Sequence, residues 1–412
     1  MLFRSRASLE TAFGQFTDWQ AKTEKMNKTD MRYGFGRLDA VGHIFNKVLM
    51  FAGADARLGH ASDAPVSYPF LWGISDQEHV QWNGIARNSR FELPGRALEY
   101  GALGRNTGEV LGVFGEVLLV PGNPLKGYAS SVRVESLDSM EQLVKVLEAP
   151  RWPAHFPPID TALAAKGETL FDSDCVACHT KPQARPAAAP TERMISFEAT
   201  LARNPADLTD IWMACNAFVH DGPTGPLEGS KDLDGKPFGP TASVARMLGA
   251  SARGAILGKK ADLVTVVFRT FFGVPSLPPV ERAFDPNDPR ADDRATCKQT
   301  PDTPVLGYKA RPLDGIWATA PYLHNGSVAS LYELLLPPDK RMAAFWVGSR
   351  AFDPVKVGYA TTDPGGGQGF LLNTRTADGR PLDGNSNAGH DYGAARLTEA
   401  DRMALIEYLK TE

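Results

Sequence analysis

The chain has 412 residues, of which 22% are charged, and its formal net charge is -4. This slightly acidic balance argues against nucleic acid or an anionic membrane as the main partner. The length allows two or three domains, and no stretch approaches the roughly 18 to 20 apolar residues of a membrane span. Because the chain has 39 glycines and 31 prolines, it should be rich in loops and only moderately helical. We expect a mainly α fold with long irregular loops and a small β hairpin.

The first 150 residues combine helix patterns with an aromatic and glycine-rich loop from 60 to 108 and a strand pair. Residues 1–30 are polar and mixed, and a helix followed by a connector is the best interpretation of them. A helical stripe begins after Leu38, with apolar residues at Val41, Ile44, Phe45, Val48 and Leu49. Two β-rich runs on either side of "PGNPLKG" predict a strand pair near 110–134. A helix from Ser136 or Asp138 should end before Pro150, so we expect residues 1–150 to form an N-terminal lobe.

The proline-rich stretch "APRWPAHFPPID" predicts a domain boundary. After it, Asp160 is placed to cap a helix with apolar residues on one face, and this helix runs into "DCVACHT". At the other end, "LTEADRMALIEYLKTE" predicts a helix with Thr398 as N-cap and Asp401 three residues later. If the two helices cross, Gly167 would allow their close contact.

The stretch "DCVACHT" places Cys175, Cys178 and His179 in a Cys-x-x-Cys-His spacing. This spacing is typical of haem c attachment, in which both thiols bond to the porphyrin and the histidine binds the iron. A zinc site would need a second pair of ligands, and a thioredoxin-like pair should follow a strand. The order of helix, haem motif, irregular middle and terminal helix is that of a cytochrome c. We therefore expect residues 158–412 to form a cytochrome c-like haem domain with long insertions.

The ligand on the other face of the iron is expected just before the terminal helix. His390 lies there in "GNSNAGHDYG", among small residues that let a backbone approach a porphyrin. A solvated loop histidine is the alternative. His324, in "APYLHNGSVASLYELL", is the second candidate, although it could instead pack beside the haem. Met342 is a weaker thioether option, and Arg311 is a candidate partner of a haem propionate or of a surface carboxylate.

The two remaining cysteines, Cys215 and Cys297, are expected to pair in an oxidising compartment, with two separate buried thiols as the alternative. Trp72 and Trp82 could line a haem pocket, but aromatic core packing is the simpler interpretation.

Several motifs resemble one known family. "APYLHNGSVASLYELL" resembles the haem-domain signature of the bacterial di-haem cytochrome c peroxidase family, and the run from "RPLDGIWATAPYLHNGS" through "NSNAGHDYG" is most similar to its rubber-oxygenase-like branch. "YGFGRLDA" and "QWNG" resemble the family's N-terminal half. The resemblance implies two covalent haems, one that meets peroxide or oxygen and one that relays electrons. It matches Cys175, Cys178 and His179 to the second attachment motif, and His390 to the distal histidine.

The chain departs from the family at one point, because residues 1–174 contain no Cys-x-x-Cys-His motif. We therefore expect a truncated chain with an incomplete N-terminal lobe, and a second haem and a signal peptide in the full-length protein. The visible site would be held by His179 and His390 and would have no vacant iron position.

We predict haem c binding and electron transfer, as the relay domain of a periplasmic or secreted di-haem oxidoreductase of the peroxidase-like or rubber-oxygenase-like kind. A small redox protein is the expected electron donor. Two alternatives stay open: the chain is itself a peroxidase or oxygenase, or it is a zinc-stabilised binding module without haem.

Overall fold

The computed structural model of the chain describes residues 5–88, 91–93, 96–98, 100–122, 126–181, 191–197, 200, 204, 208–232, 234–259 and 306–412. Its α-helices are α1 (Arg6–Met26), α2 (Ala40–Phe51), α3 (Tyr100–Val113), α4 (Val134–Lys145), α5 (Thr161–Asp174), α7 (Trp212–Val219), α8 (Val244–Leu257), α11 (Leu331–Leu334) and α12 (Glu399–Leu409). Among the described residues, none of these helices combines the length and apolar character needed to cross a bilayer.

The described strands form antiparallel pairs rather than one large sheet. The pairs are β1 (Arg37–Leu38) with β2 (Val66–Ser67), β3 (His79–Val80) with β4 (Ala86–Arg87), β5 (Phe91–Leu93) with β6 (Arg96–Leu98), β7 (Arg193–Ser196) with β10 (Gly307–Ala310), β8 (Asp221–Pro223) with β9 (Thr241–Ser243), β11 (Ala344–Val347) with β14 (Phe370–Asn373), and β12 (Phe352–Asp353) with β13 (Gly358–Tyr359). Each strand pair connects two loop segments. The two main cores are formed mainly by packed helices.

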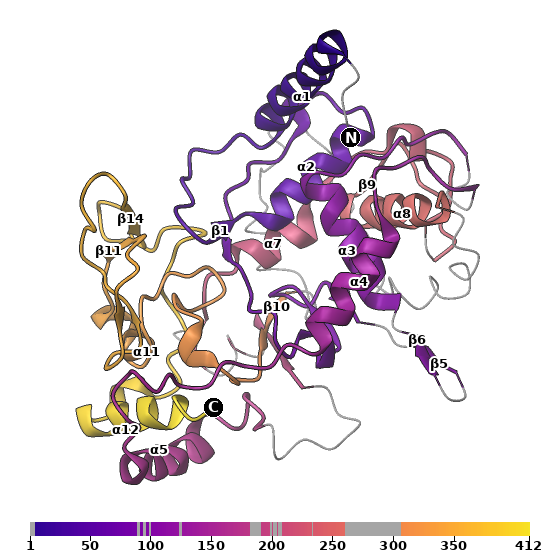
Figure 1. Cartoon of the computed structure of the whole chain (residues 1–412). Coiled ribbons are helices and arrows are strands. Elements are labelled where there is room, and N and C mark those ends of the chain that lie inside the picture. Colours follow the sequence, from indigo (N-terminus) through magenta and orange to yellow (C-terminus); the bar gives the residue numbers. More distant parts are fainter. Residues whose placement is uncertain are drawn as a thin grey trace.

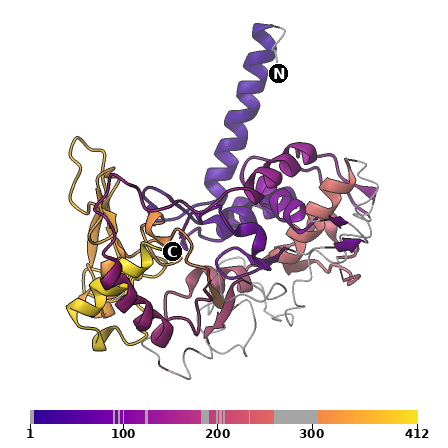
Figure 2. The same ribbon diagram turned by 60° about the horizontal axis from the view of Figure 1, so that its bottom comes forward.

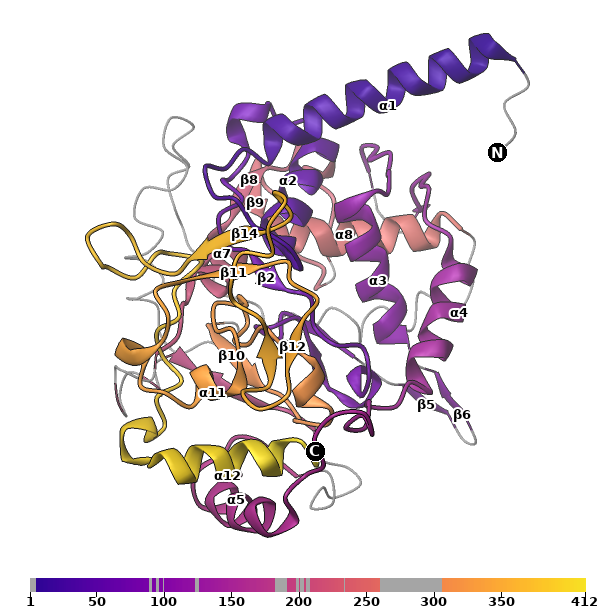
Figure 3. The ribbon, with the colours of Figure 1, turned by 60° about the vertical axis from the view of Figure 1, so that its left-hand side comes forward.

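The first core gathers α2, α3, α7 and α8 (Figure 1). The apolar stripe predicted in α2 is confirmed, because Val41, Ile44, Phe45, Val48 and Leu49 are all buried. Asp39 begins α2 by accepting a hydrogen bond from the Gly42 N–H at 2.8 Å, as an N-cap does. The predicted helix near the N-terminus is α1, which projects away from the rest of the chain (Figures 2 and 3).

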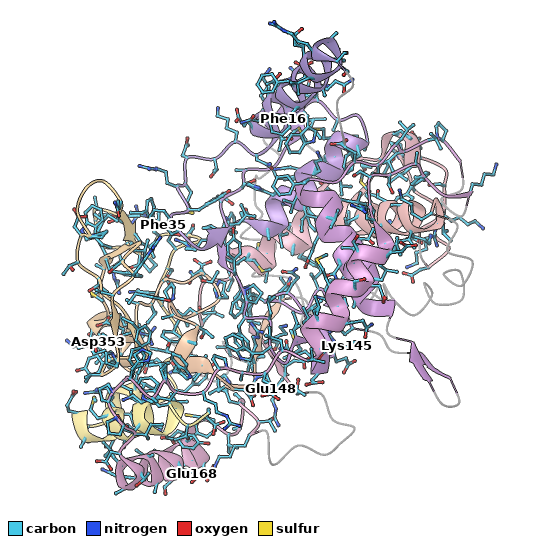
Figure 4. The ribbon with its side chains drawn as sticks, viewed as in Figure 1. Phe16, Phe35, Lys145, Glu148, Glu168 and Asp353 are labelled. Carbon is cyan, nitrogen blue, oxygen red and sulfur yellow. The ribbon has the colours of Figure 1, made fainter. Side chains whose placement is uncertain are left out.

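The second core forms where α5 packs against α12. The predicted Asp160 cap and the Thr398–Asp401 capping box are both present. Gly167 makes the close contact that we expected, because a Cβ at this position would lie 2.0 Å from the Ala404 carbonyl oxygen. Figure 4 labels Glu168 on α5 and Phe16 on α1, at opposite ends of the view.

The prediction of a strand pair near 110–134 is wrong for the beginning of its first strand. Residues up to Val113 belong to α3, and the described pairing that follows is short: a bridge between Val117 and Ser130, with hydrogen bonds from the Leu118 N–H to the Ala129 carbonyl at 2.9 Å and from the Ser131 N–H to the Glu116 carbonyl at 3.0 Å. Helical packing prevails here because Leu111 is buried in the first core and Gly112 lies directly against Ile44 of α2. The predicted helix after this region is α4, which begins at Val134, two residues earlier than Ser136.

The two cores do not follow the expected division into residues 1–150 and 158–412. Strand β10, helices α7 and α8, and Phe197 come after the haem motif in the chain, yet α7, α8, Phe197 and Tyr308 of β10 are part of the first core. The second core consists instead of α5, α12 and the segment around α11. The middle of the chain therefore returns to the N-terminal lobe before the chain completes the haem-motif lobe.

Candidate haem c site

A cavity of about 240 Å³ lies between the two cores. Its walls come from the end of α5, from β10 and the residues after it, from α11 and α12, from Phe70, and from the first core through Trp82 and Phe197. Most lining side chains are apolar, and Cys175, Cys178, His179 and His390 all reach it. The structure thus brings the motif and the proposed distal histidine to one apolar space, the kind of site that favours a large flat cofactor.

The motif forms a single turn that continues α5. The Cys175 N–H donates to the Phe171 carbonyl at 2.9 Å, and the Cys178 and His179 N–H groups donate to the Cys175 carbonyl at 3.0 and 2.9 Å. Cys175, Cys178 and His179 are partly exposed, and all three line the cavity. The turn therefore presents both thiols and the imidazole to the same space.

His179 is oriented by a backbone carbonyl. Its Nδ1 lies 2.8 Å from the Arg311 carbonyl oxygen, which can only accept, so Nδ1 carries the proton and donates. Burial lowers the pKa of His179, while this hydrogen bond acts in the opposite direction. A neutral ring protonated at Nδ1 leaves the Nε2 lone pair free for a metal, the usual arrangement of a ligand histidine.

His390 faces His179 from the opposite wall. The two ring centroids are 6.3 Å apart and the ring planes are inclined by 50°. Two imidazoles that bind opposite faces of one metal atom have centroids about 6 Å apart, because each nitrogen–metal bond is about 2 Å and each centroid lies about 1 Å behind its nitrogen. Burial, with His179 and Arg341 nearby, lowers the pKa of His390 to about 3, so its nitrogens are also available as neutral ligands.

The loop that carries His390 is held by residues of the "HNGS" segment. The Asn325 side-chain amide donates to the Ser386 carbonyl at 2.9 Å, and the Ser327 hydroxyl donates to the same carbonyl at 2.9 Å. Both residues are buried. Both precede α11, whose N-cap is Ser330. Their structural task is to anchor the loop that carries His390.

His324 also lines the cavity but is placed differently. Its ring stacks on Tyr308, with centroids 4.1 Å apart, and its carbonyl accepts a hydrogen bond from the Ser67 N–H at 2.8 Å. Burial lowers the pKa of His324 to about 3. The ring contact recorded for His179 is with His390 rather than His324. The geometry thus favours packing beside a cofactor over iron ligation for His324.

Arg311 is a buried cation of the cavity, which Lys309 also lines. Its side chain is only 6% exposed, and the guanidinium lies 3.8 Å above the Phe70 ring centroid. Nη2 donates to the Phe70 carbonyl at 3.2 Å, whereas Nε and Nη1 have no partner among the described residues. Burial lowers the pKa of Arg311 to about 10. A buried guanidinium with unused donors calls for an anion, and a haem propionate would supply one.

The surroundings of Cys175 disfavour the redox alternative. Burial, with Asp174 and Cys178 nearby, raises the pKa of Cys175 to about 12. A reactive Cys-x-x-Cys pair has a lowered thiol pKa, usually at the N-terminus of a helix, whereas this pair follows the C-terminal end of α5. Among the described residues, no group of three or more histidine, cysteine or acidic side chains is placed to hold a metal ion by itself.

Of the other residues considered from the sequence, Trp82 lines the cavity, whereas Trp72, Cys215 and Met342 are not among its lining residues. Cys215 is fully buried in α7 and is disulfide-bonded, while Cys297 lies outside the described residues. Met342 packs in a small cluster with Phe345 and Leu372. Trp82 lines the cavity and donates to the Ser67 carbonyl at 2.9 Å, as expected of a packed indole.

These features define a cytochrome c-like domain. A family model described as RoxA-like, cytochrome c-like matches residues 307–347, the segment that contains β10, Arg311, His324 and α11. The cytochrome c-like domain implies haem c, and the residues of the cavity fit that group: two thiols and a histidine on one wall, a second histidine opposite, and an unpaired buried cation.

Two similar proteins come from Sinorhizobium fredii, and both are described as uncharacterized. The protein y4iJ is 31% identical over 411 residues, which cover 94% of this chain and 61% of the relative. The protein y4iM is 42% identical over 135 residues, which cover 29% of this chain and 30% of the relative. The present chain thus spans less than two thirds of the length of either relative.

Proposed function

We propose that this chain carries one covalent haem c and relays electrons through it. Cys175 and Cys178 form the thioether bonds, and His179 and His390 bind the iron from opposite sides. The haem supplies one-electron redox chemistry when bound. The protein attaches it, shields it with apolar side chains and sets its potential.

The observation that carries this proposal is the pairing of His179 and His390 across the cavity at 6.3 Å. The hydrogen bond from His179 Nδ1 to the Arg311 carbonyl keeps Nε2 directed away from the protein backbone. With His179 and His390 both holding the iron, the haem would supply electron transfer rather than a binding place for peroxide or oxygen. A site of this kind suits electron transfer rather than direct chemistry on a substrate.

The chain is, in this proposal, the relay part of a larger di-haem oxidoreductase of the peroxidase-like or rubber-oxygenase-like kind. The RoxA-like match at residues 307–347 and the family motifs support this role, and the longer relative y4iJ leaves room for further domains. We further propose a periplasmic or secreted location, because haem c is attached outside the bacterial cytoplasm, and a small redox protein as electron donor.

Ligand substitution tests the proposal. The chain is expressed with the haem c maturation machinery, and His390→Ala is compared with the matched variant His324→Ala. Both histidines line the cavity, but only His390 faces His179. His390→Ala should convert a low-spin haem to a high-spin haem in optical and EPR spectra, while His324→Ala should stay low-spin.

A low-spin spectrum that persists in His390→Ala would refute ligation by His390. High-spin haem in His324→Ala but not in His390→Ala would transfer the distal role to His324. Protein that folds without a Soret band and binds zinc would favour the binding-module alternative. Rapid peroxide turnover by the wild-type chain alone would favour an enzyme over a relay.

A further inference from the structure

Arg341 is a buried arginine whose donors are directed at backbone carbonyls on both sides of it. Arg341 is only 4% exposed. Nη1 donates to the carbonyls of Asn387 at 2.7 Å and Gly389 at 2.8 Å, and Nη2 donates to the carbonyl of His390 at 3.2 Å. Three hydrogen bonds from one guanidinium therefore hold the loop that ends at the distal histidine.

The other edge of the same guanidinium is fixed to the end of α11. Nη2 donates to the Leu334 carbonyl at 3.1 Å, and Nε donates to the Leu336 carbonyl at 3.1 Å. Helix α11 packs against α12 and contributes Leu331 to the second core. Arg341 thus connects a packed helix to the loop of His390, and the planar fork of arginine is suited to serving several acceptors at once.

The backbone at His390 requires such support. Its φ is +52°, and the φ of the preceding Gly389 is +80°. A residue with a Cβ is strained in the left-handed region relative to ordinary backbone, so the surrounding structure must hold it there. Gly389 is also pressed against Thr209, whose amide nitrogen would lie 2.3 Å from an added Cβ.

We infer that Arg341 is the positioning residue of the distal ligand: by fixing the carbonyls of Asn387, Gly389 and His390, it keeps the His390 imidazole opposite His179 and closes the iron to external ligands. This inference rests on the proposed function, since it assumes that His390 binds the iron. Arg341 itself need not touch the haem. Its loss should loosen the loop, let His390 leave, and open a coordination position.

Carbon monoxide binding to the reduced holoprotein measures this opening. Wild-type protein should bind carbon monoxide slowly and incompletely. Arg341→Gln should show a high-spin fraction and bind carbon monoxide at least ten times faster, and Arg341→Lys, which keeps the charge but not the fork, should fall between them. Arg375→Gln is the matched control, because Arg375 also donates to backbone carbonyls of this lobe, those of Gly379 and Pro338. It should behave as wild type.

A double-mutant cycle with His390→Ala separates positioning from general destabilisation. If Arg341 acts through His390, then Arg341→Gln should have no further effect on carbon monoxide binding once His390 is removed. An equal acceleration in both backgrounds, or unchanged binding in Arg341→Gln, would overturn the inference. If Arg341→Gln yields no folded holoprotein, the same cycle is run with Arg341→Lys.

The outcome of His390→Ala alone shows which proposal has failed. A low-spin haem that remains after removal of His390 refutes the ligand assignment and, with it, the basis of the inference. A high-spin haem in His390→Ala together with wild-type behaviour of the Arg341 variants refutes the role of Arg341 and leaves the ligand assignment intact.

Discussion

Substitution of Gly167 tests how far the stability of the protein depends on the crossing of α5 and α12, the helices of the lobe that carries the haem motif. In Gly167→Ala, the added Cβ would lie 2.0 Å from the Ala404 carbonyl oxygen, 2.5 Å from its carbon and 2.9 Å from the Tyr408 Cβ. The first two atoms are backbone, so a side-chain rotation cannot relieve the clash. To reach even 3.0 Å from the oxygen, the helices must separate by about 1 Å.

Overpacking of this kind typically costs about 1–3 kcal/mol, while alanine gains about 1 kcal/mol over glycine inside a helix. We therefore expect a net loss of up to about 2 kcal/mol in the free energy of unfolding, measured by denaturant titration of the holoprotein. Gly14→Ala in α1 is the matched control, because an added Cβ there meets nothing within 4 Å. It should be neutral or stabilising. A Gly167→Ala protein as stable as Gly14→Ala would refute the reasoning.

Three further changes probe a helix cap, the buried cation of the cavity and a buried carboxyl. Thr398→Ala removes the hydroxyl of the capping box and should lower the free energy of unfolding by about 1 kcal/mol, and no change in a denaturant titration would contradict this. Arg311→Gln removes a buried positive charge that favours the reduced haem, so the midpoint potential of the haem should fall. The fall should be about 60 mV for each 1.4 kcal/mol of lost interaction. An unchanged midpoint potential in a redox titration would argue against a propionate as the partner of Arg311. Burial raises the pKa of Asp39 to about 6, above its usual 3.8, so the folded state binds the proton more tightly than the unfolded state. The contribution of Asp39 to the free energy of unfolding is therefore complete below pH 4 and declines as the pH rises to 6, by up to about 3 kcal/mol. The difference in the free energy of unfolding between wild type and Asp39→Asn, measured from pH 4 to pH 7, should show this decline.

Local signals in the sequence predicted the local structure of the haem-motif lobe well. The cap at Asp160, the capping box at Thr398 and the helical stripe of α2 are each determined within one or two turns of chain, and each is present. The close contact at Gly167 could be predicted because two helices can cross closely where a residue has no side chain. The pairing of His179 with His390 followed from the order of elements and from the family resemblance.

Features that depend on distant contacts could not be predicted. Arg341 lies 49 positions before His390, and nothing in "DKRMAAF" indicates that its guanidinium reaches the loop of the distal histidine. The β-rich appearance of "EVLGVFGEV" was overridden by packing of α3 on α2 and α8. The return of α7, α8 and β10 to the first core likewise depends on tertiary contacts. The proline-rich stretch precedes these elements in the chain but does not divide the chain into two separate cores.

EPR spectroscopy of the oxidised wild-type holoprotein, after denaturing electrophoresis has shown that haem stays bound to the chain, tests the central claim most directly. We predict a single low-spin ferric signal typical of two histidine ligands, lost in His390→Ala. A high-spin signal in the wild-type protein, or haem that dissociates on denaturation, would contradict a covalent haem c closed by His179 and His390.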